Sequence, residues 1–446
     1  MSDFVIFNWF FCISTSLLLG LVIWRYRFLI IKPSIIVIVF FHFQIQWAAA
    51  VQSGFIEEYL PHPYPFLLLS QVFPFLGLMV SFFIMHKRTE KIYSRISGET
   101  IQSLDVKPRT LIFLFVLIVV IVSIYLSFVP LSSTGIYAIL LEPLQSTSAR
   151  ESSLKLLDNA ILRYSFSLLK SALAPLLSVL AIVIFIKYIK KRKILRSLLP
   201  LVIFLLTLIA VMLPGARLPG GILILTILLA IFILYHMPIR PVYMFLSFLL
   251  ILGLPVLITI FREGQELNPL VFFDYLKGGI LERTFVVPMK TGLWHVHYGQ
   301  ELGFVGAAGV PKLAGLLGVD PINLSNIIYL KYSPYYLYSG FSNTSFVFAY
   351  YTCFGIGSLI FSLLGLWALD LAILVFDKIR NNAILLAAIA SMATSSIAFA
   401  STMYTTVLIT NGFLFILIIG FILDRISDFS LNARTKLKKN EEINHG

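Results

Sequence analysis

The sequence predicts an all-α polytopic membrane protein, and three observations support this fold class. Hydrophobic residues make up 59% of the 446 residues and charged residues only 12%, whereas a soluble domain has roughly 25% charged residues. Apolar runs of about 20 residues, the length that crosses a bilayer, recur along the chain. Lys and Arg gather in short clusters between these runs, so the net charge of +13 does not indicate a nucleic-acid-binding surface.

Eleven apolar runs are expected to form a bundle of transmembrane helices. The first run has an acidic start and no basic segment before it, so we expect a retained span and not a signal peptide. The ninth run exceeds one crossing and is expected to tilt or to begin outside the hydrocarbon. The runs are 4–24, 33–51, 65–85, 110–130, 164–186, 197–213, 218–236, 242–261, 342–376, 382–400 and 405–424.

These runs divide the chain into four regions. Residues 1–261 hold the first eight spans, with an amphipathic external segment at 131–163. Residues 342–424 hold the last three spans, and 425–446 form a basic tail. The segment 262–341 between them is about 80 residues long, a size typical of functional loops, and its aromatic and aliphatic content argues against disorder. We expect it to be a folded external cap of short helices.

The distribution of Lys and Arg predicts the orientation of the chain. The connections on one side carry 23 of these residues and those on the other side carry 10. Because basic connections stay in the cytoplasm, the N-terminus is expected outside and the C-terminus inside. The large loop 262–341 is then expected on the outer side of the membrane.

Several kinds of site are not expected. Neither GxxxxGK[ST] nor GxGxxG after a strand occurs, so an ATP-driven pump on this chain is not predicted. The two cysteines, Cys12 and Cys353, lie within apolar runs and predict no disulfide. No Cys or third His lies near His295 and His297, so we expect no zinc site and no other cofactor.

Basic residues near the predicted outer face are candidates for binding an anion. Arg217 lies in a turn with two prolines and three glycines at the start of a span, where free backbone amides favour an anion. An Arg near hydrocarbon is costly, and its planar fork suits phosphate oxygens. The alternatives are an Arg at a helix end that extends to the interface and surface ion pairs with Glu263, Glu266 and Glu282. The full set is Arg217, Arg262, Arg283, Lys290 and Lys312.

The pair His295 and His297 is the clearest titratable cluster, since histidine is the usual general base near neutral pH. Their spacing puts both on one face of an extended segment but on opposite sides of a helix. A structural role for each remains an alternative, and Asp274, Glu301 and Asp320 are further candidates for a base.

Five tyrosines occur within the ten residues 329–338. Tyrosine combines a flat apolar face with a hydroxyl, which suits sugar rings, and it is also typical of the membrane interface. The candidates for contact with a glycan are Tyr332, Tyr335, Tyr336 and Tyr338.

Three local patterns resemble the O-antigen and related surface-polysaccharide polymerases, the Wzy class of bacterial inner-membrane proteins. One is Gly215-Ala-Arg217-Leu-Pro-Gly-Gly221 at the start of a span, and another is Arg283-Thr-Phe in the large loop. The third comprises Pro311-Lys312, Pro321 and Phe354-Gly355. The chain departs from the family where 348–353 lacks the acidic residue that some members carry before Phe-Gly, and where Lys312 stands in place of the more common Arg.

The resemblance implies substrates that are oligosaccharide repeat units linked to undecaprenyl diphosphate. The growing chain would leave its lipid carrier and join a new unit, without a nucleotide, because the diphosphate is already a good leaving group. Arg217, Arg262 and Arg283 would stabilise the diphosphate charge, assisted by Lys290 and Lys312. His295 or His297 would act on the acceptor hydroxyl, and the tyrosines would guide the glycan. Membrane lipid and a chain-length-regulating membrane protein are the other implied partners.

Two alternatives stay open. An O-antigen ligase shares the membrane plan, the lipid-diphosphate donor and the large periplasmic loop. A transporter or flippase of the same lipid-linked oligosaccharide should place charged residues deep within its spans, whereas Lys170 is the only Lys or Arg inside the predicted spans.

Overall fold

The structure is a computed structural model that describes residues 2–141 without 98, 102 and 105, then 160–214, 217–235, eight positions between 253 and 268, 269–333 and 342–427. The described residues form helices and no strands, which confirms the all-α class. Nine helices of this described part are long and apolar enough to cross a membrane, so the fold is polytopic. They are Asp3–Arg25, Pro33–Val51, Tyr64–Phe83, Arg109–Phe128, Tyr164–Lys190, Ile194–Met212, Phe346–Phe376, Asn382–Ala400 and Tyr404–Ser427.

These nine helices correspond to nine of the eleven predicted spans. The predicted span 218–236 corresponds to α14 (Arg217–Tyr235), whose apolar part Pro219–Tyr235 is shorter than the other nine. The predicted span 242–261 lies mostly outside the described residues. In the predicted cap, residues 269–333 form short helices, as expected.

The chain divides into two compact units. Unit 1 comprises Met1–Glu90, Phe273–Leu371 and Ser396–Leu408, and unit 2 comprises Lys91–Phe272, Ala372–Ser395 and Ile409–Gly446. The membrane helices of unit 1 are α1 (Asp3–Arg25), α2 (Pro33–Phe41), α3 (Trp47–Val51), α5 (Tyr64–Leu67), α6 (Phe73–Phe83), α22 (Phe346–Phe354) and α23 (Ser358–Leu369). Those within unit 2 include α8 (Pro108–Phe128), α11 (Ala160–Leu168), α12 (Ala174–Lys190), α13 (Ile194–Met212), α14 and α24 (Ala372–Phe376).

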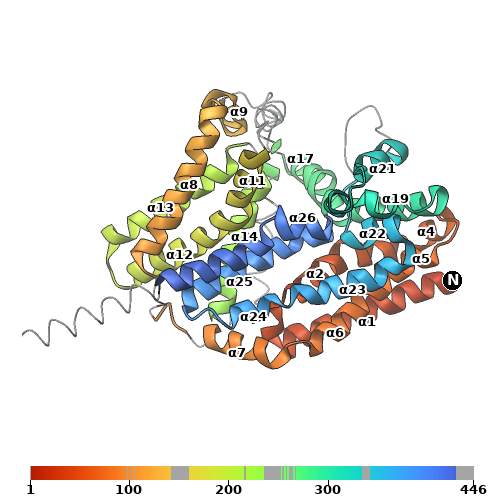
Figure 1. Ribbon diagram of the computed structural model, residues 1–446, viewed down its shortest axis with the longest axis horizontal. Coiled ribbons are helices and arrows are strands. Elements are labelled where there is room, and N and C mark those ends of the chain that lie inside the picture. Colours follow the sequence, from red (N-terminus) through yellow and green to blue (C-terminus); the bar gives the residue numbers. More distant parts are fainter. Residues whose placement is uncertain are drawn as a thin grey trace, which may run out of the picture. The chain divides into compact units, whose positions relative to one another are not determined.

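Within unit 1, α6 packs against α1, α2 and α23, which run beside it (Figure 1). Gly77 of α6 makes this packing possible, because a Cβ there would lie 2.8 Å from the Leu366 side chain of α23 and 3.3 Å from Ile38 of α2. The interior is built from large side chains such as Phe41, Phe73 and Phe346.

Two π-helical turns carry polar side chains into this interior, η2 (His42–Gln46) after α2 and η3 (Leu68–Val72) after α5. Gln46 and Gln71 exchange hydrogen bonds between their side-chain amides and backbone carbonyls, at 3.2 and 3.0 Å. The Trp47 indole donates to His42 Nε2 at 2.9 Å. Polar groups in an apolar bundle need internal partners. The Gln46–Gln71 bonds tie the second and third spans together, and the Trp47–His42 bond lies within the second span.

The long predicted span 342–376 is a broken helix. It begins at Phe346, and α22 ends at Phe354 because Gly355 adopts a φ of +63°. A short 3₁₀ turn, η10 (Gly355–Gly357), leads into α23. A Cβ at Gly355 would also lie 2.9 Å from the Phe304 ring, so both its conformation and its surroundings favour glycine.

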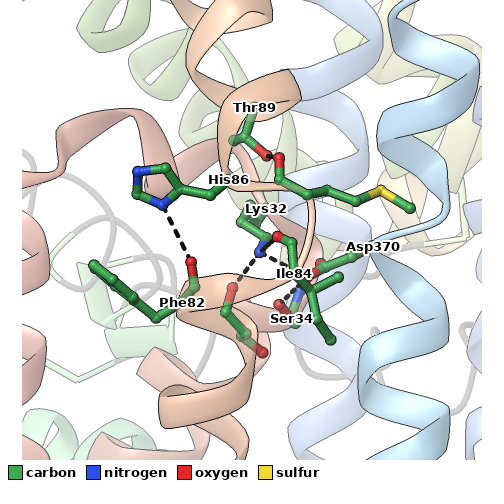
Figure 2. Close-up of polar contacts among 9 residues, drawn as sticks. Lys32, Ser34, Phe82, Ile84, His86, Thr89 and Asp370 are labelled. Carbon is green, nitrogen blue, oxygen red and sulfur yellow. Dashed lines mark hydrogen bonds and ion pairs between the residues drawn. The ribbon is translucent and has the colours of Figure 1, made fainter.

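A buried ion pair joins three helix ends of unit 1 (Figure 2). Lys32 Nζ lies 3.1 Å from Asp370 Oδ2, and neither side chain is exposed. The Ser34 backbone N–H and hydroxyl donate to the same carboxylate at 3.1 and 2.7 Å. Lys32 Nζ also donates to the carbonyls of Ser81 and Ile84. The carboxylate thus accepts a hydrogen bond from a backbone N–H group in the first turn of α2. The ammonium donates to backbone carbonyls at the C-terminus of α6.

In unit 2, α12 packs against α8, α13 and α14. The hydroxyls of Thr226 and Thr394 lie 3.0 Å apart and link α14 to the helix Asn382–Ile397 (α25). Asp424 accepts from the backbone N–H groups of Arg380 and Asn381, at 3.0 and 2.8 Å.

Large apolar side chains are exposed along α1, α8 and α13, among them Leu17, Phe113 and Leu195. A soluble monomer seldom exposes such continuous apolar surface. These faces fit contact with lipid chains.

Removal of the Asp370 carboxylate should strongly destabilise the protein. Asp370→Ala leaves the buried Lys32 ammonium without a counter-charge, which costs about 3–5 kcal/mol. The matched control is Asp377→Ala, which breaks an exposed pair with Lys91 at 3.3 Å and should cost about 1 kcal/mol or less. Thermal unfolding of the detergent-purified protein measures both changes. Equal midpoints for the two variants would contradict this role of the buried pair.

Candidate functional site

Helix α19 (Val287–Leu302) carries both predicted histidines and places them on different sides. Two residues along an α-helix are separated by about 200° around its axis. His295 points into the protein and is buried, whereas His297 is half-buried. Of the two sequence-based possibilities for this pair, the helical one is therefore observed.

His295 is a neutral, fully hydrogen-bonded residue. Its Nε2 lies 3.2 Å from the Ser342 carbonyl oxygen, and its Nδ1 lies 3.0 Å from Thr352 Oγ1 of α22. Because a carbonyl oxygen can only accept, Nε2 carries the proton. Burial lowers the pKa of His295 from 6.5 to about 4. The ring therefore joins α19 to α22 and to the segment 342–345, and we assign it a positioning role.

An open cavity of about 620 Å³ lies beside His295, and its wall is largely apolar with several polar side chains. Hydroxyl and amide side chains contribute most of its polar groups, and no Asp, Glu, Lys or Arg occurs among the described residues that line it. The Ser325 hydroxyl has no hydrogen-bond partner among the described residues. The polar lining includes Asn323, Ser325, Ser342, Asn343, Thr344 and Thr402.

Hydrogen bonds fix the walls of this cavity. Thr291 Oγ1 of α19 donates to the Asn343 carbonyl at 2.8 Å. The Ser342 backbone N–H and hydroxyl both donate to the Ser325 carbonyl, at 2.9 and 2.8 Å, and Ser325 belongs to α21 (Leu324–Tyr332). The segment 342–344 is therefore held between α19 and α21.

An apolar cluster supports the cavity. Val310, Leu324, Ile328 and Cys353 are buried together. Gly309, which lines the cavity, has no room for a side chain, since a Cβ there would lie 2.6 Å from Cys353 Sγ. This packing positions α20 (Pro311–Leu317) and α21 against α22.

His297 belongs to a second cluster, with Tyr332 of α21 and Glu301. Tyr332 donates its hydroxyl proton to Glu301 Oε2 at 2.7 Å, and His297 Nδ1 lies 3.0 Å from the Tyr332 oxygen. Since that oxygen has already given its proton to the carboxylate, Nδ1 must donate. The neutral His297 ring then carries no proton on Nε2, and Nε2 has no hydrogen-bond partner among the described residues. This is the orientation that a histidine requires in order to accept a proton through Nε2.

Charge reinforces this arrangement. Lys331 Nζ lies 2.8 Å from Glu301 Oε1, and the hydrogen bonds from Lys331 and Tyr332 lower the pKa of the Glu301 carboxyl. Burial, and then the bond to Glu301, raise the pKa of the Tyr332 hydroxyl. Glu301 is thus an anion, and it lies 3.5 Å from His297 Nδ1, where it stabilises a positive charge that develops on the imidazole. The Tyr59 ring lies 5.1 Å from the His297 ring.

The structure places the five predicted anion-binding residues in different environments. Arg283 and Lys290 are exposed in unit 1, and neither has an ion-pair partner among the described residues. Lys290 lies seven residues before His297, which lies four residues before Glu301, so all three share one face of α19. Burial lowers the pKa of the Lys312 ammonium. Arg217 begins α14 in unit 2, so its convergence with Arg283 stays a prediction, and Arg262 lies outside the described residues.

The other candidates are only partly within the described chain. Tyr332 is described and bonds to Glu301, whereas Tyr335, Tyr336 and Tyr338 lie outside the described residues. Asp274 and Asp320 are exposed, and neither joins the His297 cluster. Among the described residues, no group of three His, Cys, Asp or Glu side chains is placed to hold a metal ion.

The sequence contained one signal for this cluster that the prediction did not use. His297 and Glu301 are four residues apart, the spacing that brings side chains together on a helix. The roles of Thr352 and Ser342 had no such local signal, because they lie about 50 residues from His295.

Comparison of the chain with protein-family models, curated proteins and solved structures finds no match.

Burial of neutral His295 should make stability depend on pH. The unfolded residue takes up a proton below about 6.5, whereas the folded residue stays neutral down to about 4. The unfolded state therefore binds more protons than the folded state between pH 6.5 and 4. The free energy of unfolding consequently decreases as the pH falls through this range. The folded protein should lose up to about 3 kcal/mol between these limits.

Thermal unfolding measured across this pH range should show the loss in the wild-type protein and in the control His62→Asn, which alters an exposed histidine of the same unit. The loss should be smaller in His295→Asn. An unchanged pH dependence in His295→Asn would show that His295 is not the group responsible.

Proposed function

We propose that the chain is a membrane glycosyltransferase that polymerises undecaprenyl-diphosphate-linked oligosaccharide repeat units into O-antigen or a related surface polysaccharide. The reaction would take place at the periplasmic face of the bacterial inner membrane. The observation that carries the proposal is the orientation of His297, whose Nδ1 is held by Tyr332 and Glu301 while Nε2 stays free. The helical membrane fold and the resemblance of the loop motifs to the polymerase family support it.

In this reaction, a hydroxyl of the acceptor unit attacks the anomeric carbon of the donor sugar. A new C–O bond forms, and the bond between that carbon and the diphosphate oxygen breaks, so its electron pair leaves with undecaprenyl diphosphate. His297 Nε2 takes the proton of the attacking hydroxyl. Glu301 stabilises the resulting imidazolium, and Tyr332 keeps the ring oriented, the arrangement seen when a carboxylate orients a catalytic histidine.

Cationic side chains would stabilise the leaving diphosphate. Arg283 and Lys290 are exposed, lie in unit 1 with His297 and have no ion-pair partner among the described residues. Arg217, Arg262 and Lys312 complete the proposed set. Positive charge placed where the leaving group develops its negative charge lowers the barrier, and no nucleotide is required.

The cavity beside His295 supports recognition of a glycan. Hydroxyl and amide groups on its wall can donate to and accept from sugar hydroxyls, and Ser325 offers a hydroxyl with no partner among the described residues. Its volume of about 620 Å³ falls within the usual range for small-molecule sites. Tyr332, Tyr335, Tyr336 and Tyr338 would guide the remainder of the chain, and a chain-length-regulating membrane protein would be a partner.

Substitution of His297 should abolish polymer formation in cells. A strain in which the gene is deleted is restored with His297→Gln, and the glycan ladder of its lipopolysaccharide is compared with that of the wild type. Loss of a general base reduces a rate by about 10²–10⁴-fold, so only single repeat units should remain attached to the core. The control His62→Gln changes an exposed histidine of the same unit and should restore the full ladder.

Other outcomes of this experiment separate the alternatives. A normal ladder from His297→Gln, at a membrane level equal to that of the wild type, would contradict the assigned base. A bare core after deletion of the gene would indicate an O-antigen ligase. Accumulation of lipid-linked units on the cytoplasmic side would indicate a flippase.

A further inference from the structure

A second pocket of unit 1 lies at the turn between α6 and α7 (His86–Ser97). An open groove of about 650 Å³ is present there. Tyr26, Phe82 and Phe83 provide its aromatic wall, and Lys87 and Arg88 provide its charge. No Asp or Glu occurs among the described residues that line it. The groove is distinct from the cavity beside His295, with which it shares no lining residue.

The basic side chains of the groove are not used within the protein. Lys87 and Arg88 are exposed and have no ion-pair or hydrogen-bond partner among the described residues. Arg25 and Arg27 flank Tyr26 and are also exposed. Two cations therefore line an aromatic groove whose described lining contains no carboxylate, and two more lie next to Tyr26 in the sequence.

The backbone of this turn is held in a fixed and unusual conformation (Figure 2). Met85 has a φ of +53°, which a residue with a side chain seldom adopts. Lys32 Nζ holds the Ser81 and Ile84 carbonyls, and Thr89 Oγ1 donates to the Met85 carbonyl at 2.9 Å. His86 Nδ1 donates to the Phe82 carbonyl at 3.2 Å. The turn carbonyls of 81, 82, 84 and 85 are thus satisfied within the protein, and Lys87 and Arg88 extend from a preorganised support.

Large apolar side chains are exposed on the two spans whose ends contribute to the groove, α1 and α6. Phe83 is 72% exposed, and Trp24, two residues before Tyr26, is 75% exposed. Met79 of α6 and Leu21 of α1 are also exposed. Aromatic side chains at the end of a span are typical of the bilayer interface. A ligand that reaches both parts of this surface must have an anionic head and an apolar tail.

We propose that this groove binds an acidic phospholipid, with the phosphate of its headgroup against Lys87 and Arg88 and its acyl chains along the exposed faces of α1 and α6. The charge of the groove is complementary to that headgroup. The positive-inside pattern predicts that this end of unit 1 faces the cytoplasmic leaflet, where basic residues near a span attract acidic lipids. A free phosphate would use only the cations and leave the apolar wall exposed. The site is independent of the proposed glycosyl transfer.

Binding of phosphatidylglycerol to the full-length protein in neutral detergent tests the proposal, with apparent dissociation constants measured by native mass spectrometry. We expect phosphatidylglycerol to bind at least tenfold more tightly than phosphatidylcholine. In Lys87→Gln/Arg88→Gln this preference should fall at least tenfold, because each cation near an acidic headgroup contributes about a fivefold factor. The charge-preserving exchange Lys87→Arg/Arg88→Lys should retain it.

The matched control is Lys191→Gln/Lys193→Gln, which removes two exposed cations from another basic segment predicted on the same side of the membrane. This variant should keep the preference. An equal loss in both double variants would overturn the proposal, because it would indicate attraction by general surface charge. Displacement of the lipid by inorganic phosphate at comparable concentration would also overturn it, in favour of a site for free anions.

Discussion

A helix bundle with an apolar interior cannot leave a buried charge unpaired, and the Lys32–Asp370 pair meets this constraint where three helices of unit 1 end. The pair does more than neutralise two charges. Its carboxylate satisfies the first turn of α2 through Ser34, and its ammonium satisfies carbonyls at the end of α6. The three helix ends are therefore fixed relative to one another. The basic groove at the α6–α7 turn depends on this arrangement, because the same ammonium holds the turn from which Lys87 extends.

The same constraint acts on the predicted periplasmic part of unit 1. Burial keeps His295 neutral, and its two nitrogens connect α19 to Thr352 and to Ser342. This connection fixes the wall of the cavity beside His295. It also sets the rotation of α19, so that His297 and Glu301 face Tyr332. His295 therefore positions the helix that carries His297. A structural role for His295 is compatible with the proposed catalytic role of His297.

Local properties of the sequence predicted the spans, because hydrophobicity over 20 residues is sufficient to identify a membrane helix. The break at Gly355 was harder to predict, since a glycine within an apolar run does not reveal its φ. Contacts between distant residues were not predictable from spacing. Lys32 and Asp370 are 338 residues apart, and Lys32 was expected in a cytoplasmic connection. In contrast, the spacing of His297 and Glu301 predicts contact between their side chains if the segment is a helix.

The proposed glycosyl transfer at unit 1 uses a lipid-diphosphate donor and can be tested by polymerisation with the purified protein in liposomes, supplied only with undecaprenyl-diphosphate-linked repeat units. We expect a ladder of lipid-linked oligomers and release of undecaprenyl diphosphate without added nucleotide, at a rate at least tenfold lower for Arg283→Ala. The control Lys277→Ala, which alters another exposed cation of unit 1, should keep the wild-type rate. The proposed reaction would be wrong if correctly folded wild-type protein yielded no oligomer from its own organism's repeat units.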